Sequence, residues 1–292
     1  PKGRSLQEQN NSMSQKGGLM ESKTAQAIGL KYNPVAVFLA DEKPEKALQF
    51  KEGKQGCVMF MFANAAKGRI AAFDAETCGC PGGAVGLGFG NAYHYFPGGV
   101  DCFAHFLSSG NTGWEKGEQV AQGLKGAAGE EFTDDFLYGE RYKKSPELVE
   151  QWIEELPITQ NKTRYVLFEP LSQADSGTKT PENVVFTVDA DQLSALVILA
   201  NYARNGRENV SIPWAAGCQN LGILPWHEAE SENPRAVVGL TDISARKAVR
   251  KLFGQEYLTF AVPWKMFLEM EENVEDSFLE RPTWRSLQET KK

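Results

Sequence analysis

Four cysteines have the residue type and spacing for chemistry: Cys57, Cys78, Cys80 and Cys218. Cys57, Cys80 and Cys218 each stand at the predicted start of a helix, where the helix dipole and free backbone N–H groups favour the thiolate and lower the thiol pKa. Cys78 adds a fourth sulfur close to Cys80, and Gly79 between them allows the tight turn that brings both side chains to one face. Four thiolates are the ligand set of a tetrahedral zinc site or of an iron–sulfur cluster.

The spacing of these cysteines does not choose between the two metals. Neither the Cys-x₂-Cys pairs of a zinc ribbon nor the local Cys-x₂-Cys-x₂-Cys of ferredoxins is present. If only Cys57, Cys80 and Cys218 bind, the metal keeps an open position, as metals that act on substrates do. We expect a [4Fe–4S] cluster held by these three thiols, with Cys78 as the candidate fourth ligand, that performs redox or Lewis-acid chemistry on a small molecule. Two alternatives stay open. The same thiols could bind zinc, or the protein could hold no metal and act as a thiol-redox or small-ligand binding protein.

An internal duplication supports the pairing of cysteines from distant segments. A helix, a short strand and a Gly-Cys pair occur over residues 63–80 and again over residues 200–218. Cys80 and Cys218 each follow an arginine by 11 residues. A duplicated unit that keeps its cysteine predicts that the two thiols meet across a pseudo-twofold axis.

Other motifs give weaker indications. Residues 82–90 are rich in glycine, but their spacing matches neither a Walker loop nor the dinucleotide fingerprint, and close helix packing accounts for them at least as well as phosphate binding. The three histidines, His94, His105 and His227, lie among aromatic or apolar residues and are expected to be structural. Arg246 follows a helix cap and is expected at the surface. The sequence contains no nucleophile elbow, so we do not expect a hydrolase of the Ser-His-Asp kind.

The elements that must position the cysteines are predicted from hydrophobic patterns. Continuous apolar runs predict buried strands over 35–39, 165–170, 236–240 and 258–262. Apolar segments with caps and terminating glycines predict helices over 57–66, 193–204 (capped by Asp191), 242–250 (capped by Thr241-Asp242) and 264–278. These elements indicate an α+β (mixed α/β) fold made of two pseudo-repeated strand–helix–strand halves packed as one globular unit.

The same patterns divide the chain into four parts. Residues 1–12 are polar and lack periodicity, which is typical of a loose leader without chemistry. Residues 13–113 form the first repeat half, and the charged, helix-prone residues 114–157 form a helical insertion. Residues 158–292 form the second half with a C-terminal helix.

Composition excludes several classes of protein. A chain of 292 residues can bury a full core without disulfide or metal staples. Its net charge of −7, with scattered basic residues, opposes binding to a nucleic acid. No apolar run approaches the roughly 18 residues that span a bilayer, and residues 1–29 lack a signal-peptide core, so we expect a cytoplasmic protein. Five cysteines, an odd count, indicate reduced thiols.

Four segments together resemble a known family: Gly56-Cys57-Val58-Met59, Glu76 to Ala84 around Cys78-Gly79-Cys80-Pro81, Gly217-Cys218-Gln219-Asn220, and Pro234 to Arg246. They resemble the prokaryotic family named domain of unknown function 169, over roughly Met13 to Phe278. The resemblance implies membership of a family common in anaerobic bacteria and archaea, with no activity to carry over. It implies that Cys57, Cys80 and Cys218 are family motif positions, whereas Cys78 is a feature of only part of the family.

We expect the partner to be a small molecule or a redox protein, with no nucleic acid and no membrane. Whether the protein is an enzyme, and whether it forms a homo-oligomer, stays open at this point.

Overall fold

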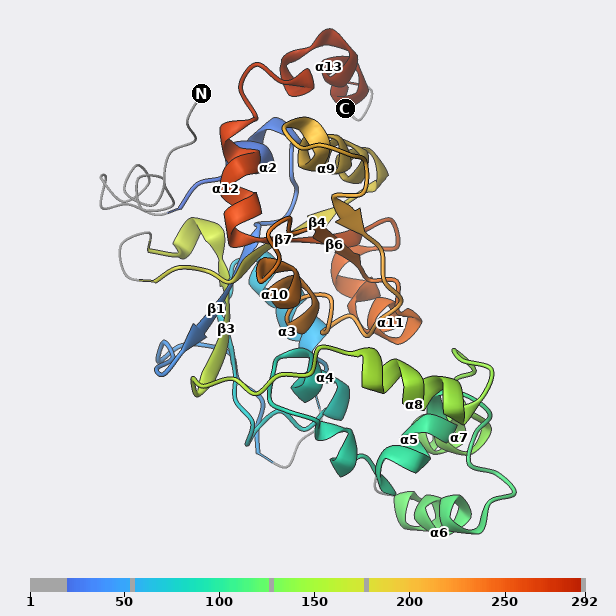
Figure 1. Cartoon of the computed structure of the whole chain (residues 1–292). Helices are drawn as coiled ribbons and strands as arrows, with labels where there is room; N and C mark the ends of the chain where they lie inside the picture. The colour runs from blue at the N-terminus through green and yellow to red at the C-terminus, as the bar shows by residue number, and fades with distance from the viewer. Residues whose placement is uncertain (1–19, 53–55, 126–128, 176–178, 290–292) are drawn as a thin grey trace. The chain divides into compact units, whose positions relative to one another are not determined.

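The computed structural model describes residues 20–52, 56–125, 129–175 and 179–289 (Figure 1). The predicted leader, residues 1–12, lies outside the described residues. The chain divides into two units, one made of residues 1–89 and 160–292 and the other of residues 90–159. Among the described residues, no helix combines the length and the apolar character that crossing a membrane requires.

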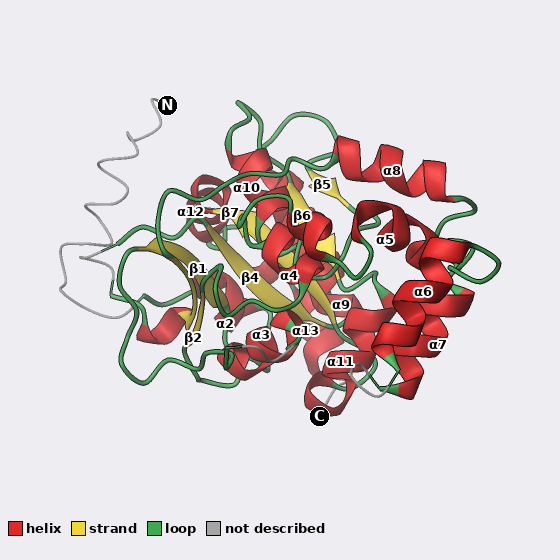
Figure 2. Ribbon diagram, turned by 90° about the horizontal axis from the view of Figure 1, so that it is seen from below, coloured by secondary structure: helices red, strands yellow, loops and turns green. Residues whose placement is uncertain are grey.

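The first unit is built on a mixed sheet of seven strands in the order β2-β3-β1-β4-β7-β6-β5. Its strands are β1 (Val35–Ala40), β2 (Ala71–Phe73), β3 (Tyr165–Pro170), β4 (Asn183–Val188), β5 (Val210–Ser211), β6 (Ala236–Gly239) and β7 (Leu258–Pro263). Only the β5–β6 pair is parallel, and the other neighbours are antiparallel. The α+β fold class is therefore confirmed, and the apolar runs predicted as strands form β1, β3, β6 and β7. Figure 2 shows the strands twisted relative to one another, with helices on both faces.

Helices cover the sheet on both faces because successive residues of a buried strand point to opposite sides. On one face, Phe38, Leu167, Phe186 and Phe260 pack in a core with Leu196 and other apolar residues of the helices. That face is covered by α2 (Lys23–Ala27), α9 (Ala190–Tyr202) and α12 (Trp264–Glu272). The short helix α13 (Pro282–Glu289) joins it through a hydrogen bond from the Trp284 indole to the Ala27 carbonyl, 3.0 Å long.

The opposite face carries the helices that position the cysteines. These are α3 (Val58–Ala66), α4 (Pro81–Gly86), α10 (Ile223–Ala229) and α11 (Ile243–Phe253). The Phe62 ring of α3 meets Phe168 of β3 at 6.1 Å and Phe253 of α11 at 6.0 Å, both edge-on. Figure 1 shows α3, α10 and α11 on one side of β4, β6 and β7, and α9 and α12 on the other.

The internal duplication is not confirmed by this arrangement. The two helices expected to correspond, α3 and α9, cover opposite faces of the sheet, since α3 packs on Phe168 while α9 packs on the face of Leu167. The two Gly-Cys segments nevertheless come together on the face of α3, as described below.

Two predicted helix boundaries are wrong for local reasons. Helix α9 is capped by Asp189 rather than Asp191, because the Asp189 carboxylate accepts a hydrogen bond from the Gln192 N–H while the Gln192 side chain accepts one from the Asp189 N–H, a capping box. Helix α12 ends at Glu272, well before residue 278, and Asp276 has a φ of 62° that a helix cannot continue. Ser277 then caps a separate 3-10 turn, η3 (Phe278–Glu280). Another such turn, η2 (Leu171–Gln173), follows β3.

The second unit is helical. It contains η1 (Ala92–Tyr95), α5 (Gly99–Leu107), α6 (Glu115–Leu124), α7 (Glu130–Tyr138) and α8 (Pro146–Glu155). Its core is aromatic: Phe96 lies 5.1 Å from Phe103 and 6.1 Å from Phe136 between ring centroids. The His105 ring stacks on Trp114 at 4.6 Å, which agrees with a structural role for this histidine.

Candidate functional site

Helix starts bring the predicted cysteines onto one face of the sheet. Cys57 is the N-cap of α3 and Cys80 is the N-cap of α4, both with extended backbone. Pro81 occupies the first turn of α4, where its missing N–H costs no hydrogen bond. The Cys80 Sγ accepts a hydrogen bond from the Gly83 N–H at 3.4 Å. The helix-start positions predicted for both cysteines are therefore confirmed.

Cys218 lies in the turn of residues 217–222, before α10 begins at Ile223, so the helix start predicted at Cys218 is wrong. The Cys218 side chain contacts the start of α4 directly. Its Sγ donates a hydrogen bond to the Gly82 carbonyl at 3.0 Å. Because Cys80 begins α4, this bond joins the segments of the two predicted partner cysteines.

Glycines allow the Cys218 turn to press against α4. A Cβ on Gly222 would lie 2.1 Å from the Gly86 carbonyl oxygen, and a Cβ on Gly86 would lie 2.7 Å from the Cys218 carbonyl carbon and the Gln219 nitrogen. Neither position has room for a side chain. Close packing thus explains the glycine at residue 86 of the glycine-rich stretch without a phosphate.

Cys78 approaches the same turn of α4 from the loop after β2. A Cβ on Gly83 would lie 3.4 Å from the Cys78 Sγ and 3.4 Å from the Cys80 Cβ. The loop is held by Asp74, whose carbonyl accepts from the Cys78 N–H at 3.1 Å and whose carboxylate accepts from the Thr77 N–H at 2.8 Å. The sulfur predicted as a fourth ligand therefore faces the first turn of α4.

A carboxylate that the sequence marks only as a helix cap also reaches the Cys218 turn. Asp242 caps α11 through the Ser244 and Ala245 N–H groups, and its second oxygen accepts from the Gly217 N–H at 3.1 Å. A Cβ on Gly217 would lie 2.8 Å from the Ala245 Cβ and 3.0 Å from the Met59 Sδ. The turn is thus fixed between α3 and α11, a contact that no sequence pattern indicates.

Burial sets the acidity of the thiols, against the expectation from the helix starts. Burial raises the pKa of Cys57, Cys80 and Cys218, and it raises the pKa of Cys78 to about 12. Backbone N–H groups of the first helical turns lower the pKa of Cys57 and Cys80, but by less than burial raises it. The predicted lowering of the thiol pKa is therefore wrong, because the desolvation of a buried thiolate outweighs the helix field.

The four thiols are close enough to act on one another, and we call Cys57, Cys78, Cys80 and Cys218 the thiol cluster. After burial, negative charge on Cys80, Cys57 and Cys78 further raises the pKa of Cys218, and charge on Cys57 raises that of Cys80. Cys102, in contrast, lies in α5 of the second unit, where burial raises its thiol pKa and the charges of Lys116 and Asp101 act on it more weakly. Within the described ranges, no three His, Cys, Asp or Glu side chains stand close enough together to hold one metal ion.

The Arg246 side chain is bound by backbone carbonyls. Its guanidinium donates to the carbonyls of Tyr257 at 3.1 Å, Gln255 at 2.5 Å and Leu240 at 3.3 Å. It therefore ties α11 to the ends of β6 and β7 and serves structure.

The comparisons with known proteins give one match. The family model of domain of unknown function 169, described as an uncharacterised ArCR, matches residues 23–273 and so includes every member of the thiol cluster. Neither the curated proteins nor the solved structures contain a match to this chain.

Proposed function

Because the chain belongs to the family of domain of unknown function 169, whose description names no activity, we propose its function from the thiol cluster: the protein binds an iron–sulfur cluster. Cys57, Cys80 and Cys218 are the proposed ligands of a [4Fe–4S] cluster, and Cys78 is the candidate fourth ligand. The bound group would supply redox or Lewis-acid chemistry for a small molecule.

The arrangement of the thiols carries this proposal. Sulfur ligands of a single tetrahedral zinc ion lie about 2.3 Å from the metal and hence roughly 3.8 Å from one another. Among the described residues no three candidate ligands are grouped for one ion, yet the charges of the four thiols affect one another. In a [4Fe–4S] cluster each cysteine binds a different iron, so its ligand sulfurs are farther apart. The mutual effect of the four charges supports one shared site, and the metal and sulfide analysis below decides between an iron–sulfur cluster and zinc.

The acidity of the thiols supports a metal over a metal-free thiol-redox site. A redox-active cysteine needs a thiolate near neutral pH, whereas burial raises the pKa of every thiol in the cluster. A bound cation reverses this preference, since a coordinating thiol is deprotonated outright. The negative charge that burial disfavours on these thiols is thus the charge that iron would neutralise.

Backbone donors near the sulfurs supply the remaining support. The Gly83 N–H donates to the Cys80 sulfur at 3.4 Å, and the backbone N–H groups of Phe60 and Met59 lower the pKa of the Cys57 thiol against the larger effect of burial. Hydrogen bonds to ligand sulfur are one of the means by which proteins stabilise and tune iron–sulfur clusters.

The test is the content of iron, zinc and acid-labile sulfide, with a visible spectrum, in protein purified without oxygen. The expected result is about four iron and four sulfide per chain with broad visible absorption, and their loss in Cys80→Ser and Cys218→Ser. Cys102→Ser is the matched control, a buried cysteine outside the thiol cluster, and it should keep the full content. One zinc per chain, or no metal in the wild type, would overturn the proposal.

Cys78→Ser separates a three-cysteine from a four-cysteine site. If Cys78 is a ligand, this variant should lose iron as Cys80→Ser does. If one iron of the cluster has no cysteine ligand, Cys78→Ser should retain about four iron per chain. A small thiol added to the wild type or to Cys78→Ser should then bind that iron and change the visible spectrum.

A further inference from the structure

A second group of buried polar side chains lies beneath the turn that carries Cys218. Asn220 belongs to that turn, Thr187 to β4 and Thr259 to β7, and the solvent-exposed fraction of each is 0%. Both amide atoms of Asn220 and both threonine hydroxyls have no hydrogen-bond partner among the described residues. We call these three residues the polar site.

Strand register places the members of the polar site side by side. Thr187 pairs with Thr259 across β4 and β7, and directly paired residues share one face of a sheet. Gly239 pairs with Thr259 on the other side, across β6 and β7. A Cβ on Gly239 would lie 2.6 Å from the Thr259 Oγ1 and 2.6 Å from the Asn220 Cβ. The side chains of Asn220 and Thr259 therefore meet over Gly239.

A neighbouring asparagine shows that this face can satisfy an amide. Asn183 also lies on β4, an even number of residues before Thr187, and its exposed fraction is likewise 0%. Its Nδ2 donates to the Leu221 carbonyl at 3.1 Å, and its Oδ1 accepts from the Trp226 indole N–H at 2.9 Å. The protein thus supplies both partners of Asn183 and neither partner of Asn220.

Native proteins pair roughly nine-tenths or more of their buried polar groups, and a group left unpaired away from water is costly. Four unpaired atoms at one place therefore point to a missing partner rather than to four separate penalties. None of the three side chains is charged, and the amide and the hydroxyls can both donate and accept. A charged partner would be buried here without a counter-charge, which is costly, so we infer a neutral partner that both donates and accepts.

We propose that the polar site binds a small neutral hydrogen-bonding molecule, of which water is the smallest member, held between the Asn220 amide and the Thr259 and Thr187 hydroxyls. The site requires no metal, so it goes beyond the function proposed for the thiol cluster. The occupant has two sources, solvent water or the amide, hydroxyl or carbonyl group of an organic ligand.

The crystal structure of the full-length protein at a resolution that shows waters is the direct test. Density within hydrogen-bond distance of both Asn220 and Thr259, lost in Thr259→Val, is the expected result. Density of one atom identifies water, and larger connected density identifies an organic molecule; both support the proposal. Direct pairing of Asn220 with Thr259, or no density, would overturn it.

The melting temperature of Thr259→Val gives a second test, because its expected change differs between an occupied and an unoccupied polar site. If an occupant bonds the Thr259 hydroxyl, the isosteric Thr259→Val leaves that occupant short of a partner, and the melting temperature falls. If the hydroxyl is unpaired, the valine leaves the melting temperature unchanged or raises it, which would contradict the proposal.

A double-mutant cycle then asks whether the residues share the occupant. Thr259→Val and Asn220→Leu should be non-additive, with a coupling of about threefold or more in the unfolding equilibrium constant. Thr259→Val with Ser277→Ala is the control, because the Ser277 hydroxyl is buried but bonds Val274 at 2.8 Å, and this pair should be additive. If Asn220→Leu does not fold, Thr187→Val takes its place. Additivity in the test pair would argue against a shared ligand.

Discussion

The Asp242 carboxylate accepts a hydrogen bond from the Gly217 N–H at 3.1 Å while its other oxygen caps α11. One side chain therefore joins the first turn of a helix to the turn that carries Cys218. Its negative charge also raises the pKa of Cys57, Cys80 and Cys218. Asp242 thus orients one member of the thiol cluster and opposes the ionisation of three.

Asp242→Ala should lower the free energy of unfolding by about 1 to 2 kcal/mol, because α11 loses its cap and the Gly217 N–H loses its partner. Urea unfolding measures this change. Asp189→Ala is the matched control, since Asp189 also caps a helix, α9, which covers the opposite face of the sheet. Both variants should lose stability, but only Asp242→Ala should change the rate at which Cys218 reacts with a thiol reagent. Equal reaction rates in the two variants would show that Asp242 does not hold this turn.

Glycine substitutions in α4 should separate close packing from helix propensity. Gly86→Ala places a methyl group 2.7 Å from the backbone of Cys218 and Gln219, so it should destabilise the protein by about 2 kcal/mol or more. Gly82→Ala, in the same helix, has no atom within 4 Å of the new methyl group and should be neutral or stabilising by about 0.5 to 1 kcal/mol. Thermal unfolding compares the two. A loss in Gly82→Ala equal to that in Gly86→Ala would mean that the packing against Cys218 is not the cause.

The local elements of this fold follow from short segments of sequence, and so do two of its helix starts. The run from Val35 to Leu39 predicts β1, and Cys80 followed by Pro81 predicts the start of α4. The cap of α9 could also be predicted from sequence. Gln192 stands three residues after Asp189 and completes a capping box, and this pattern favours Asp189 over Asp191 as the cap.

The long-range relations could not be predicted in this way. Whether α3 and α9 cover the same face depends on strand order, which short similar segments do not determine. The pKa of a thiol at a helix start depends on how deeply packing buries it, and the sequence around Cys80 contains the helix start but not the burial. The bond from Cys218 to the Gly82 carbonyl joins residues 136 positions apart, and it depends on the packing of α4 against the Cys218 turn.

The raised thiol pKa values predict how the metal-free protein responds to alkali. Burial raises the pKa of Cys78 to about 12, compared with about 8.5 for a free cysteine. Below about pH 8.5 the thiol is protonated in both states, so its contribution to stability is fully present. As the pH rises from about 8.5 toward 12, the unfolded state releases the proton first, and the free energy of unfolding falls.

Cys78→Ala should therefore lose less stability in alkali than the wild type, by on the order of 2 kcal/mol between about pH 8 and about pH 10.5. Urea midpoints of both metal-free proteins at the two pH values give the difference. Lysine and tyrosine side chains titrate in both proteins, so their contributions to the pH dependence cancel in the difference between the two. Parallel pH profiles for the two proteins would contradict a raised pKa at Cys78.

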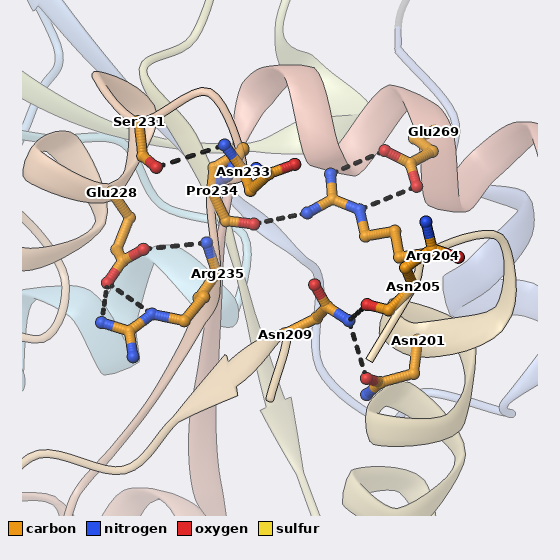
Figure 3. Close-up of polar contacts among 10 residues, drawn as sticks. All are labelled: Asn201, Arg204, Asn205, Asn209, Glu228, Ser231, Asn233, Pro234, Arg235 and Glu269. Carbon is orange, nitrogen blue, oxygen red and sulfur yellow. Dashed lines mark hydrogen bonds and ion pairs between the residues drawn. The ribbon is translucent and has the colours of Figure 1, made fainter. Parts of the chain in front are cut away.

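The ion pairs around the start of β6 offer a contrast between a half-buried and an exposed arginine (Figure 3). Arg204, which follows the C-cap of α9, donates to both carboxylate oxygens of Glu269 on α12 at 2.8 and 2.6 Å and to the Pro234 carbonyl at 2.5 Å. Its side chain is 13% exposed, whereas that of Arg235, paired with Glu228 at 2.6 Å, is 49% exposed.

Arg204→Ala should lower the free energy of unfolding by about 2 to 3 kcal/mol, because a largely buried guanidinium is removed together with its charge-assisted bonds to Glu269 and to the Pro234 carbonyl. Arg235→Ala removes the same chemistry from a more exposed site and should lower it by no more than about 1 kcal/mol. Urea unfolding at low and high salt distinguishes them further, since salt should reduce the effect of Arg235→Ala more than that of Arg204→Ala. Equal losses with equal salt dependence would show that Arg204 contributes only as a surface ion pair, and that the junction of α9, α12 and β6 is held by its apolar contacts instead.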